Sequence, residues 1–193
     1  MSLPFSLKYS AGPLFVALCS VIAFFFEPMS GNYLAYDRYA IQGLETWRIV
    51  IGNIVHTNGY HLLLNLAGLA LLWALHGEHY RIGLYLKVFV WCCLGTSVGL
   101  YFFSPDLIWY AGLSGALHGI FAWGACVDIK EKMKSGWLLL VGLAIKVGYE
   151  QIDGSSEQVA NLIDAKVAVD AHLFGALTGI VIFLLMYITA KRK

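Results

Sequence analysis

Charged residues are scarce in this chain. Only 13% of its 193 residues are Asp, Glu, Lys or Arg, while 59% are hydrophobic. A soluble domain usually carries about 25% charged residues, so the composition excludes an ordinary soluble protein and predicts a multi-span membrane protein. The net charge is only +1, so no global excess of positive charge favours nucleic acid as a partner. The length suits one compact unit, and residues 1–193 are expected to form a single domain.

Cysteine is also rare and lacks the spacing of a metal or redox motif. The four cysteines lie in apolar runs, and Cys92 and Cys93 are adjacent. Because such motifs place at least two residues between their cysteines, these side chains are expected to be small buried hydrophobic groups. The first apolar run is followed by Glu27 and a polar stretch, not by small residues typical of a cleavage site. We therefore expect it to be the first membrane span.

Apolar runs predict an all-α membrane protein with a bundle of six transmembrane helices. The six segments lie near residues 12–26, 59–76, 82–103, 111–127, 136–149 and 167–190. Some are shorter than the roughly 20 residues of a full crossing, and Lys146 interrupts the fifth. The long first outer loop, about residues 27–58, mixes aromatic and charged residues, as segments at the membrane interface do.

Lysine and arginine are distributed unevenly among the loops. With the N-terminus in the cytoplasm, eight of them lie on the cytoplasmic side and three lie in outer loops. Positive residues concentrate in short cytoplasmic loops. Both termini are therefore expected in the cytoplasm.

Unusual polar residues occur near the outer ends of three spans that run in the same direction. The second span has His61 and Asn65, the fourth has Ser114 and His118, and the sixth has His172. The topology places all five in the outer half of the membrane. Polar groups there need partners or a water-filled cavity, so these side chains are expected to meet.

Glycines accompany the polar residues on two of these spans. Gly115 and Gly119 lie in the fourth span, and Gly175 and Gly179 lie in the sixth. Small residues at this spacing let helix backbones approach closely. We therefore expect these two spans to pack tightly enough for a serine on one to reach a histidine on the other.

The gathered groups have the chemistry of a serine hydrolase. A nucleophilic serine needs a base within hydrogen-bonding distance and donors where the oxyanion forms. A proton or ion pathway is an alternative, because intramembrane His and Asp also build relays. A metal site is a third, but the chain has no HExxH motif and its histidines do not pair with carboxylates at ligand spacing. No metal or other cofactor is therefore expected.

Three motifs together resemble the signature of a known family. "HLLLN" at 61–65, "GLSG" at 112–115 and "AHLFGALTG" at 171–179 look like the motifs of rhomboid intramembrane serine proteases. Their order and the six-span layout are similar too. "ETWR" resembles the Trp-Arg motif in the family's first outer loop, where Glu45 and Arg48 are expected to form a structural pair.

The resemblance implies roles for the polar residues of the spans. Ser114 would be the nucleophile and His172 the general base. His61, Asn65 and the backbone N–H of Ser114 would form the oxyanion hole. Rhomboids typically carry a tyrosine four residues after the serine, where it packs on the catalytic histidine, whereas this chain has His118.

The sequence "GLSGALHG" is most similar to the rhombosortase subfamily. These bacterial proteases are linked to proteins that end in a Gly-Gly, hydrophobic and basic sorting tail. The resemblance implies membrane-anchored C-terminal tails as substrates and membrane lipid as the surroundings. It also implies the inner membrane of a bacterium, with the active site open to the periplasm. A general rhomboid protease of single-span proteins and an inactive client-binding protein are the alternatives.

Three roles are open for His118, which shares a helix face with Ser114. It could orient His172, compete with it as the base, or accept a bond within the bundle. Orientation is favoured, because residues four apart on one rigid helix stack and do not present a base to a nucleophile from the side. Asp170 precedes His172 by two residues, so it is expected to point away and not to complete a triad.

The other histidines are not expected to take part in chemistry. His56 lies in the outer loop and is expected at the membrane interface. His76 and His79 lie at the cytoplasmic side and are expected in solvent.

Overall fold

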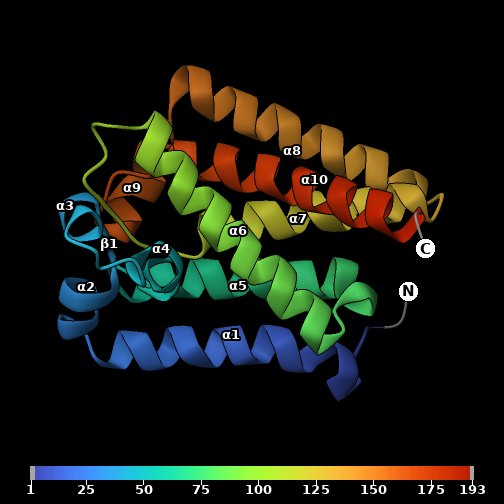
Figure 1. Ribbon diagram of the computed structural model, residues 1–193, viewed down its shortest axis with the longest axis horizontal. Helices are drawn as coiled ribbons and strands as arrows, with labels where there is room; N and C mark the ends of the chain where they lie inside the picture. Colours follow the sequence, from blue (N-terminus) through green and yellow to red (C-terminus); the bar gives the residue numbers. More distant parts are fainter. Residues whose placement is uncertain (1–2, 192–193) are drawn as a thin grey trace.

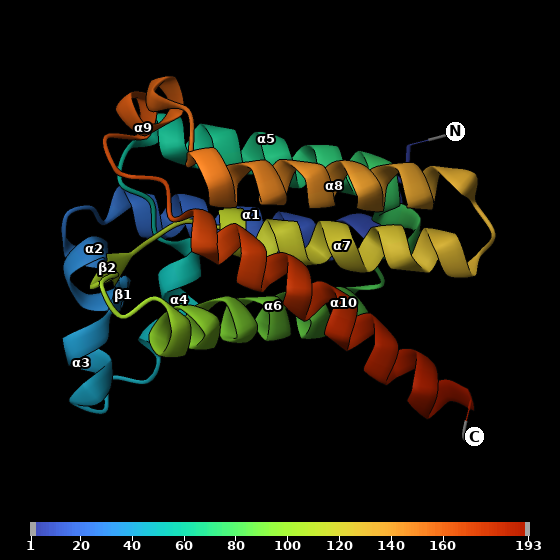
Figure 2. The same cartoon turned by 90° about the horizontal axis from the view of Figure 1, so that it is seen from above.

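The computed structural model describes residues 3–191, and long helices dominate it (Figure 1). Each predicted apolar segment corresponds to one of them. In chain order they are α1 (Leu7–Phe25), α5 (Gly59–His76), α6 (Ile82–Phe103), α7 (Ser114–Lys130), α8 (Lys134–Asp153) and α10 (Val169–Lys191). The start of α1 and the end of α10 lie at one end of the bundle, and the elements of the outer loop lie at the other (Figures 1 and 2).

Four of these helices in the described part are long and apolar enough to cross a bilayer: α1, α5 with the turn after it, α6 and α10. Helix α7 has 17 residues, which is about 26 Å at 1.5 Å per residue. It packs against α5, α6, α8 and α10, so its sides face protein and its length need not match the hydrocarbon core. Helix α8 contacts only α7 and α10 extensively and lies at the edge of the bundle (Figure 1).

Helices α7 and α10 touch through their backbones. A Cβ added to Gly175 would overlap the carbonyl oxygen of Gly115, and one added to Gly179 would overlap that of Gly119. A Cβ at Gly119 would lie 2.6 Å from the Cys92 sulfur of α6 and 2.7 Å from the Gly175 carbonyl oxygen of α10. Any larger side chain at these glycines would therefore separate the helices that bring the serine and histidine motifs together.

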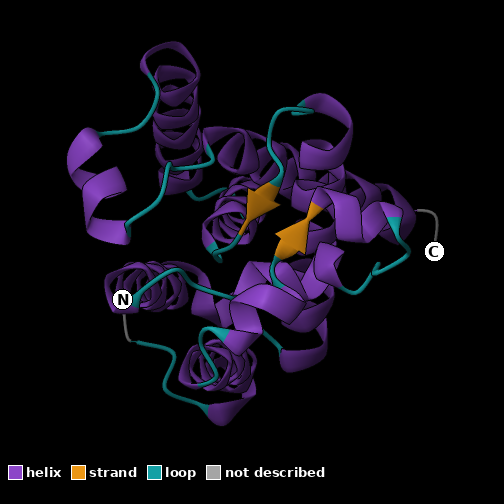
Figure 3. Cartoon of the chain, turned by 90° about the vertical axis from the view of Figure 1, so that its left-hand side faces the viewer, coloured by secondary structure: helices purple, strands orange, loops and turns teal. Residues whose placement is uncertain are grey.

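The outer loop is more structured than an interfacial segment would require. It contains α2 (Met29–Leu34), β1 (Tyr36–Asp37), α3 (Arg38–Gln42), α4 (Arg48–Ile51) and the 3-10 helix η1 (Gly52–Ile54). Strand β1 pairs antiparallel with β2 (Trp109–Tyr110), with Tyr36 opposite Tyr110, and this small ladder is the β structure among the described residues (Figure 3). The ladder ties the loop to the segment just before α7.

Two buried arginines stabilise this loop, Arg48 from within and Arg38 by fastening it to the bundle. Arg48 Nε lies 2.7 Å from a carboxylate oxygen of Glu45, and its other nitrogens donate to backbone carbonyls of the loop. Arg38 donates to carbonyls at and beyond the end of α6, those of Leu100, Tyr101, Ser104 and Leu107. Carbonyls at a helix end have no partner within the helix, so Arg38 satisfies several at once.

At the opposite end, the expectation that His76 and His79 are solvated is wrong. His76 is 1% exposed, and both rings approach the buried carboxylate of Asp128, His79 at 3.0 Å and His76 at 3.4 Å. A Cβ at Gly124 of α7 would lie 2.6 Å from the His76 ring. The missing side chain of Gly124 therefore leaves the space that His76 fills.

Candidate active site

Ser114 and His172 meet where α7 and α10 begin. Ser114 is the first residue of α7, and His172 lies in the first turn of α10. His172 Nε2 is 3.0 Å from Ser114 Oγ, and the residue is 5% exposed. Gly175, one turn after His172, contacts the backbone of Gly115, the residue after Ser114. This close approach of the two helices sets the short distance between Ser114 and His172.

The chain enters α7 through a tight turn at Gly112. This residue has φ of +120°, a conformation that side chains disfavour. A Cβ there would also lie 2.6 Å from His61 Nε2, so glycine is needed for space as well. The Tyr110 hydroxyl donates to the Gly112 carbonyl at 2.7 Å, which fixes the orientation of this peptide group in the turn. Since the first N–H groups of a helix have no partner within it, the backbone N–H of Ser114 is free for an incoming oxygen.

His61 and Asn65 lie on the same face of α5 and flank this turn. The Thr57 hydroxyl lies 3.0 Å from His61 Nδ1, which directs Nε2 toward Gly112. Asn65 donates one of its two amide N–H groups to the His61 carbonyl at 3.0 Å. The other is left for a ligand.

His118 lies flat against His172. The ring centroids are 4.1 Å apart and the planes differ by 13°. His118 Nε2 is 2.6 Å from Lys146 Nζ, and Nδ1 is 2.7 Å from the Ser114 carbonyl oxygen. An ammonium group only donates hydrogen bonds, so Nε2 accepts and the ring proton sits on Nδ1. Both nitrogens of His118 are thus engaged, and neither contacts the Ser114 hydroxyl.

Helix α8 adds two residues that the sequence analysis did not assign to the site. A carboxylate oxygen of Glu150 lies 2.9 Å from His172 Nδ1, and Lys146 Nζ lies 2.9 Å from Glu150. One donor atom from each of His118, Glu150 and His172 lies within 4.8 Å of the others, a set of groups that metals also use. The Lys146 ammonium lies among them and is the cation they share. A lysine inside an otherwise apolar segment, with a glutamate one turn later, was the signal in the sequence.

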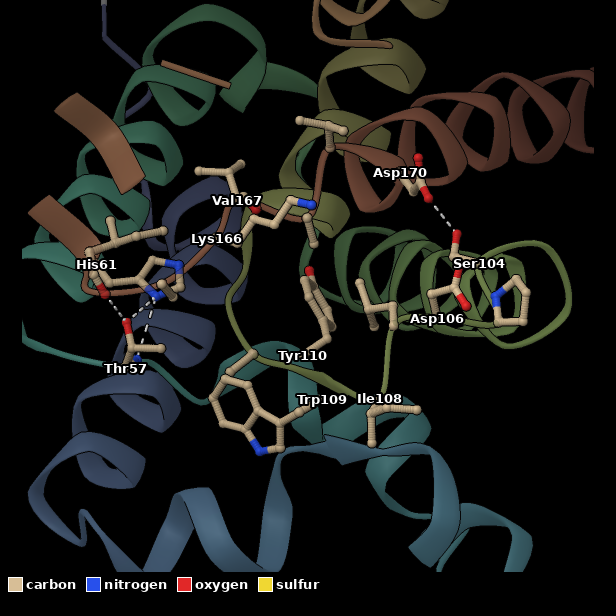
Figure 4. A pocket seen from close by; sticks show the side chains of 18 of the residues that line it. Thr57, His61, Ser104, Asp106, Ile108, Trp109, Tyr110, Lys166, Val167 and Asp170 are labelled. Atoms are coloured by element: carbon tan, nitrogen blue, oxygen red, sulfur yellow. Dashed lines mark hydrogen bonds between the residues drawn. The ribbon is translucent and has the colours of Figure 1, made fainter. Parts of the chain in front are cut away.

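Two other titratable residues lie near the site but outside the contact between Ser114 and His172. Asp170 accepts a 2.5 Å hydrogen bond from the Ser104 hydroxyl and lines a cavity whose lining does not include His172 (Figure 4). The sequence predicted His56 at the membrane interface, but the residue is buried within the protein and is 1% exposed. Its ring packs edge-on against that of His61, with 5.0 Å between the ring centroids. Burial lowers the pKa of His56 to about 3, so this ring is neutral.

Two cavities meet at Ser114 and His61. The first, of about 630 Å³, opens beside the outer loop, and Thr57, Tyr110, Lys166 and Asp170 are among its lining residues (Figure 4). The second, of about 300 Å³, follows α5 and is mostly apolar; its lining includes Leu64, Gly68, Leu71, Leu75 and Phe121. Ser114 therefore lines both a chamber that contains several polar side chains and a groove lined mainly by hydrocarbon.

This chain was compared with curated proteins and with models of protein families. No curated protein matches it. The family model of the rhomboid domain matches residues 43–189, a range that contains all three motifs, the Glu45–Arg48 pair and α8. The chain therefore belongs to the rhomboid family of intramembrane serine proteases.

Proposed function

We propose that this protein is an intramembrane serine endopeptidase in which Ser114 is the nucleophile and His172 the general base. The single observation that carries this proposal is the 3.0 Å contact between Ser114 Oγ and His172 Nε2. A hydroxyl becomes a competent nucleophile when a base at this distance removes its proton. His118 is not the base, because its nitrogens are occupied by Lys146 and the Ser114 carbonyl.

The donors around Ser114 suit the charge that develops during acyl transfer. When Ser114 Oγ attacks a peptide carbonyl, the carbonyl oxygen becomes negative. The Ser114 N–H at the start of α7, the free amide N–H of Asn65 and the His61 ring would surround that oxygen. Donors held in place before the reaction stabilise the transition state without reorganising, and tight packing of Gly112 against His61 holds them.

Proton transfer through His172 completes the cycle. The imidazolium donates its proton to the leaving amine and releases the C-terminal fragment. Water entering through the outer cavity then attacks the Ser114 ester, with His172 again as base. The hydrolysed product leaves with a new carboxylate.

The two cavities suit a membrane-anchored segment with a polar, helix-poor start. An apolar tail would occupy the groove along α5, and the residues before it would lie extended across Ser114. Glycine destabilises helices by about 1 kcal/mol relative to alanine, so a Gly-Gly, hydrophobic and basic tail on an exported protein is the substrate we propose. The excess of Lys and Arg at the opposite end favours a cytoplasmic-membrane protein with this site on the outer side.

A paired labelling and cleavage experiment tests this function. We expect a fluorophosphonate to label the wild-type protein in detergent and not the Ser114→Ala variant. We also expect the protein to cleave a tail substrate that has Gly-Gly before its apolar segment. Cleavage of this substrate should be at least tenfold faster than cleavage of a matched substrate that has Leu-Leu at the same position. Equal rates would favour a general rhomboid protease, and absence of labelling and cleavage would favour a client-binding protein.

Asn65 gives a graded prediction. Asn65→Ala removes one oxyanion donor while Ser114 and His172 keep their contact, so kcat should fall by roughly 10²–10³-fold and KM should change little. Rates measured over a range of substrate concentrations check this. An unchanged kcat would remove Asn65 from the oxyanion hole.

A further inference from the structure

The side of His172 that faces away from Ser114 is covered by helix α8. Its Nδ1 lies 2.9 Å from a carboxylate oxygen of Glu150, 22 residues earlier in the chain. The side chains of His172 and Glu150 are 6% and 13% exposed. A hydrogen bond to a carboxylate in a site this enclosed is stronger than one in water.

The donors and acceptors around His172 define where its proton sits. A carboxylate can only accept a hydrogen bond, so the contact with Glu150 requires the proton on Nδ1. In the neutral ring Nε2 is then unprotonated, and it faces the Ser114 hydroxyl at 3.0 Å. Lys146 Nζ is also near Nδ1, at 3.3 Å, but it is closer to both Glu150 and His118 Nε2. The ammonium therefore bonds to these two partners and leaves Nδ1 to Glu150.

Lys146 and His118 hold the carboxylate in place. Lys146 precedes Glu150 by one helical turn and contacts both of its oxygens at 2.9 Å. The same ammonium reaches across to His118, which is stacked on the His172 ring and bonded to the Ser114 carbonyl. The contacts form a closed ring that runs from Lys146 through Glu150, His172 and His118 back to Lys146. Helices α8, α7 and α10 are therefore joined by one network at the site.

We infer that Glu150 is a positioning residue for the proposed reaction, with Lys146 as its anchor. It holds the His172 ring with Nε2 toward Ser114 and stabilises the imidazolium that forms when the Ser114 O–H bond breaks. The proton moves from Oγ to Nε2, the Nδ1 proton stays on His172, and the carboxylate stays ionised. This inference rests on the proposed function but adds a third helix to the machinery, so that Ser114, His172 and Glu150 act as a triad.

Glu150→Gln is the decisive variant. Glutamine has the same shape, but its amide can donate to Nδ1 and so favours the tautomer with the proton on Nε2, the wrong one for a base. In a serine-protease triad the corresponding Asp→Asn change lowers kcat about 10⁴-fold. We expect kcat to fall by roughly 10²–10⁴-fold, with KM changed less than about threefold, because Glu150 contacts His172 and not the substrate. The matched control is Asp153→Asn, which removes an exposed carboxylate from the same helix and should keep wild-type kcat.

Nitrogen-15 spectra of the histidine rings separate positioning from a structural role. In wild-type protein in detergent, the His172 signals, identified by their loss in His172→Ala, should report a proton on Nδ1. In Glu150→Gln they should shift toward the Nε2-protonated form, and in Glu150→Asp they should remain closer to wild type, with partial recovery of kcat. Wild-type kcat together with an unchanged tautomer in Glu150→Gln would overturn the inference. A wild-type protein that neither labels nor cleaves would instead overturn the proposed protease, while the tautomer shift would still decide whether Glu150 positions the ring.

Discussion

Ser114→Ala, His172→Ala and the double variant are expected to lose cleavage to the same extent, roughly 10⁶-fold in kcat. The reason is that the two side chains act as one unit: the hydroxyl has no base without the imidazole, and the imidazole has no nucleophile without the hydroxyl. The 3.0 Å contact between them is the geometric basis. Initial rates with a tail substrate in detergent measure all three variants against wild type.

The exposed Ser156→Ala in the loop before α9 (Glu157–Ile163) serves as the control, and it should keep the wild-type rate. Circular dichroism of each variant shows whether the helices are retained. If the losses of the two single variants multiplied in the double variant, Ser114 and His172 would act independently, and the pairing proposed here would be wrong.

Gly175→Ala is expected to destabilise the protein by about 3 kcal/mol, the upper end of what overpacking costs. The added methyl group would overlap the Gly115 carbonyl oxygen, and backbone cannot move aside as a flexible side chain can. Helices α7 and α10 must then separate, which also moves His172 from Ser114. The midpoint temperature of thermal unfolding in detergent and the rate of fluorophosphonate labelling should both decline.

Gly142→Ala is the matched control for this change. Gly142 lies within α8, and a Cβ there would meet nothing within 4 Å. The same one-carbon change should therefore leave thermal stability unchanged or raise it, since alanine is the better helix former. Equal stability of Gly175→Ala and Gly142→Ala would show that the close approach of α7 and α10 does not depend on glycine.

Much of this site could be predicted from local features of the chain. Apolar runs located the long helices, and the common direction of three of them placed Ser114, His172, His61 and Asn65 near one another. Gly112, which forms the tight turn before α7, is the first residue of the "GLSG" motif. These features are readable because hydropathy and helical spacing depend on near neighbours in sequence.

Other partners could not be predicted, because they depend on helices that approach from elsewhere. Asp170, the acidic residue nearest to His172 in sequence, bonds to Ser104, while the carboxylate that reaches the ring comes from Glu150. His76 looked like a solvated end residue and is instead buried against Gly124. Distance along the chain did not indicate distance in space for any of these three residues.

By itself the sequence determined that this is a helical membrane protein with a serine, histidines and an amide near one end, and its motifs indicated the family. Only the tertiary structure decided on which nitrogen His118 carries its proton, and that Lys146 and Glu150 complete the network around His172. The physical reason is that a polar side chain in an apolar bundle bonds to whatever partner packing brings within about 3 Å. Packing is set by shape complementarity between distant segments, above all by the glycines that let α7 and α10 touch.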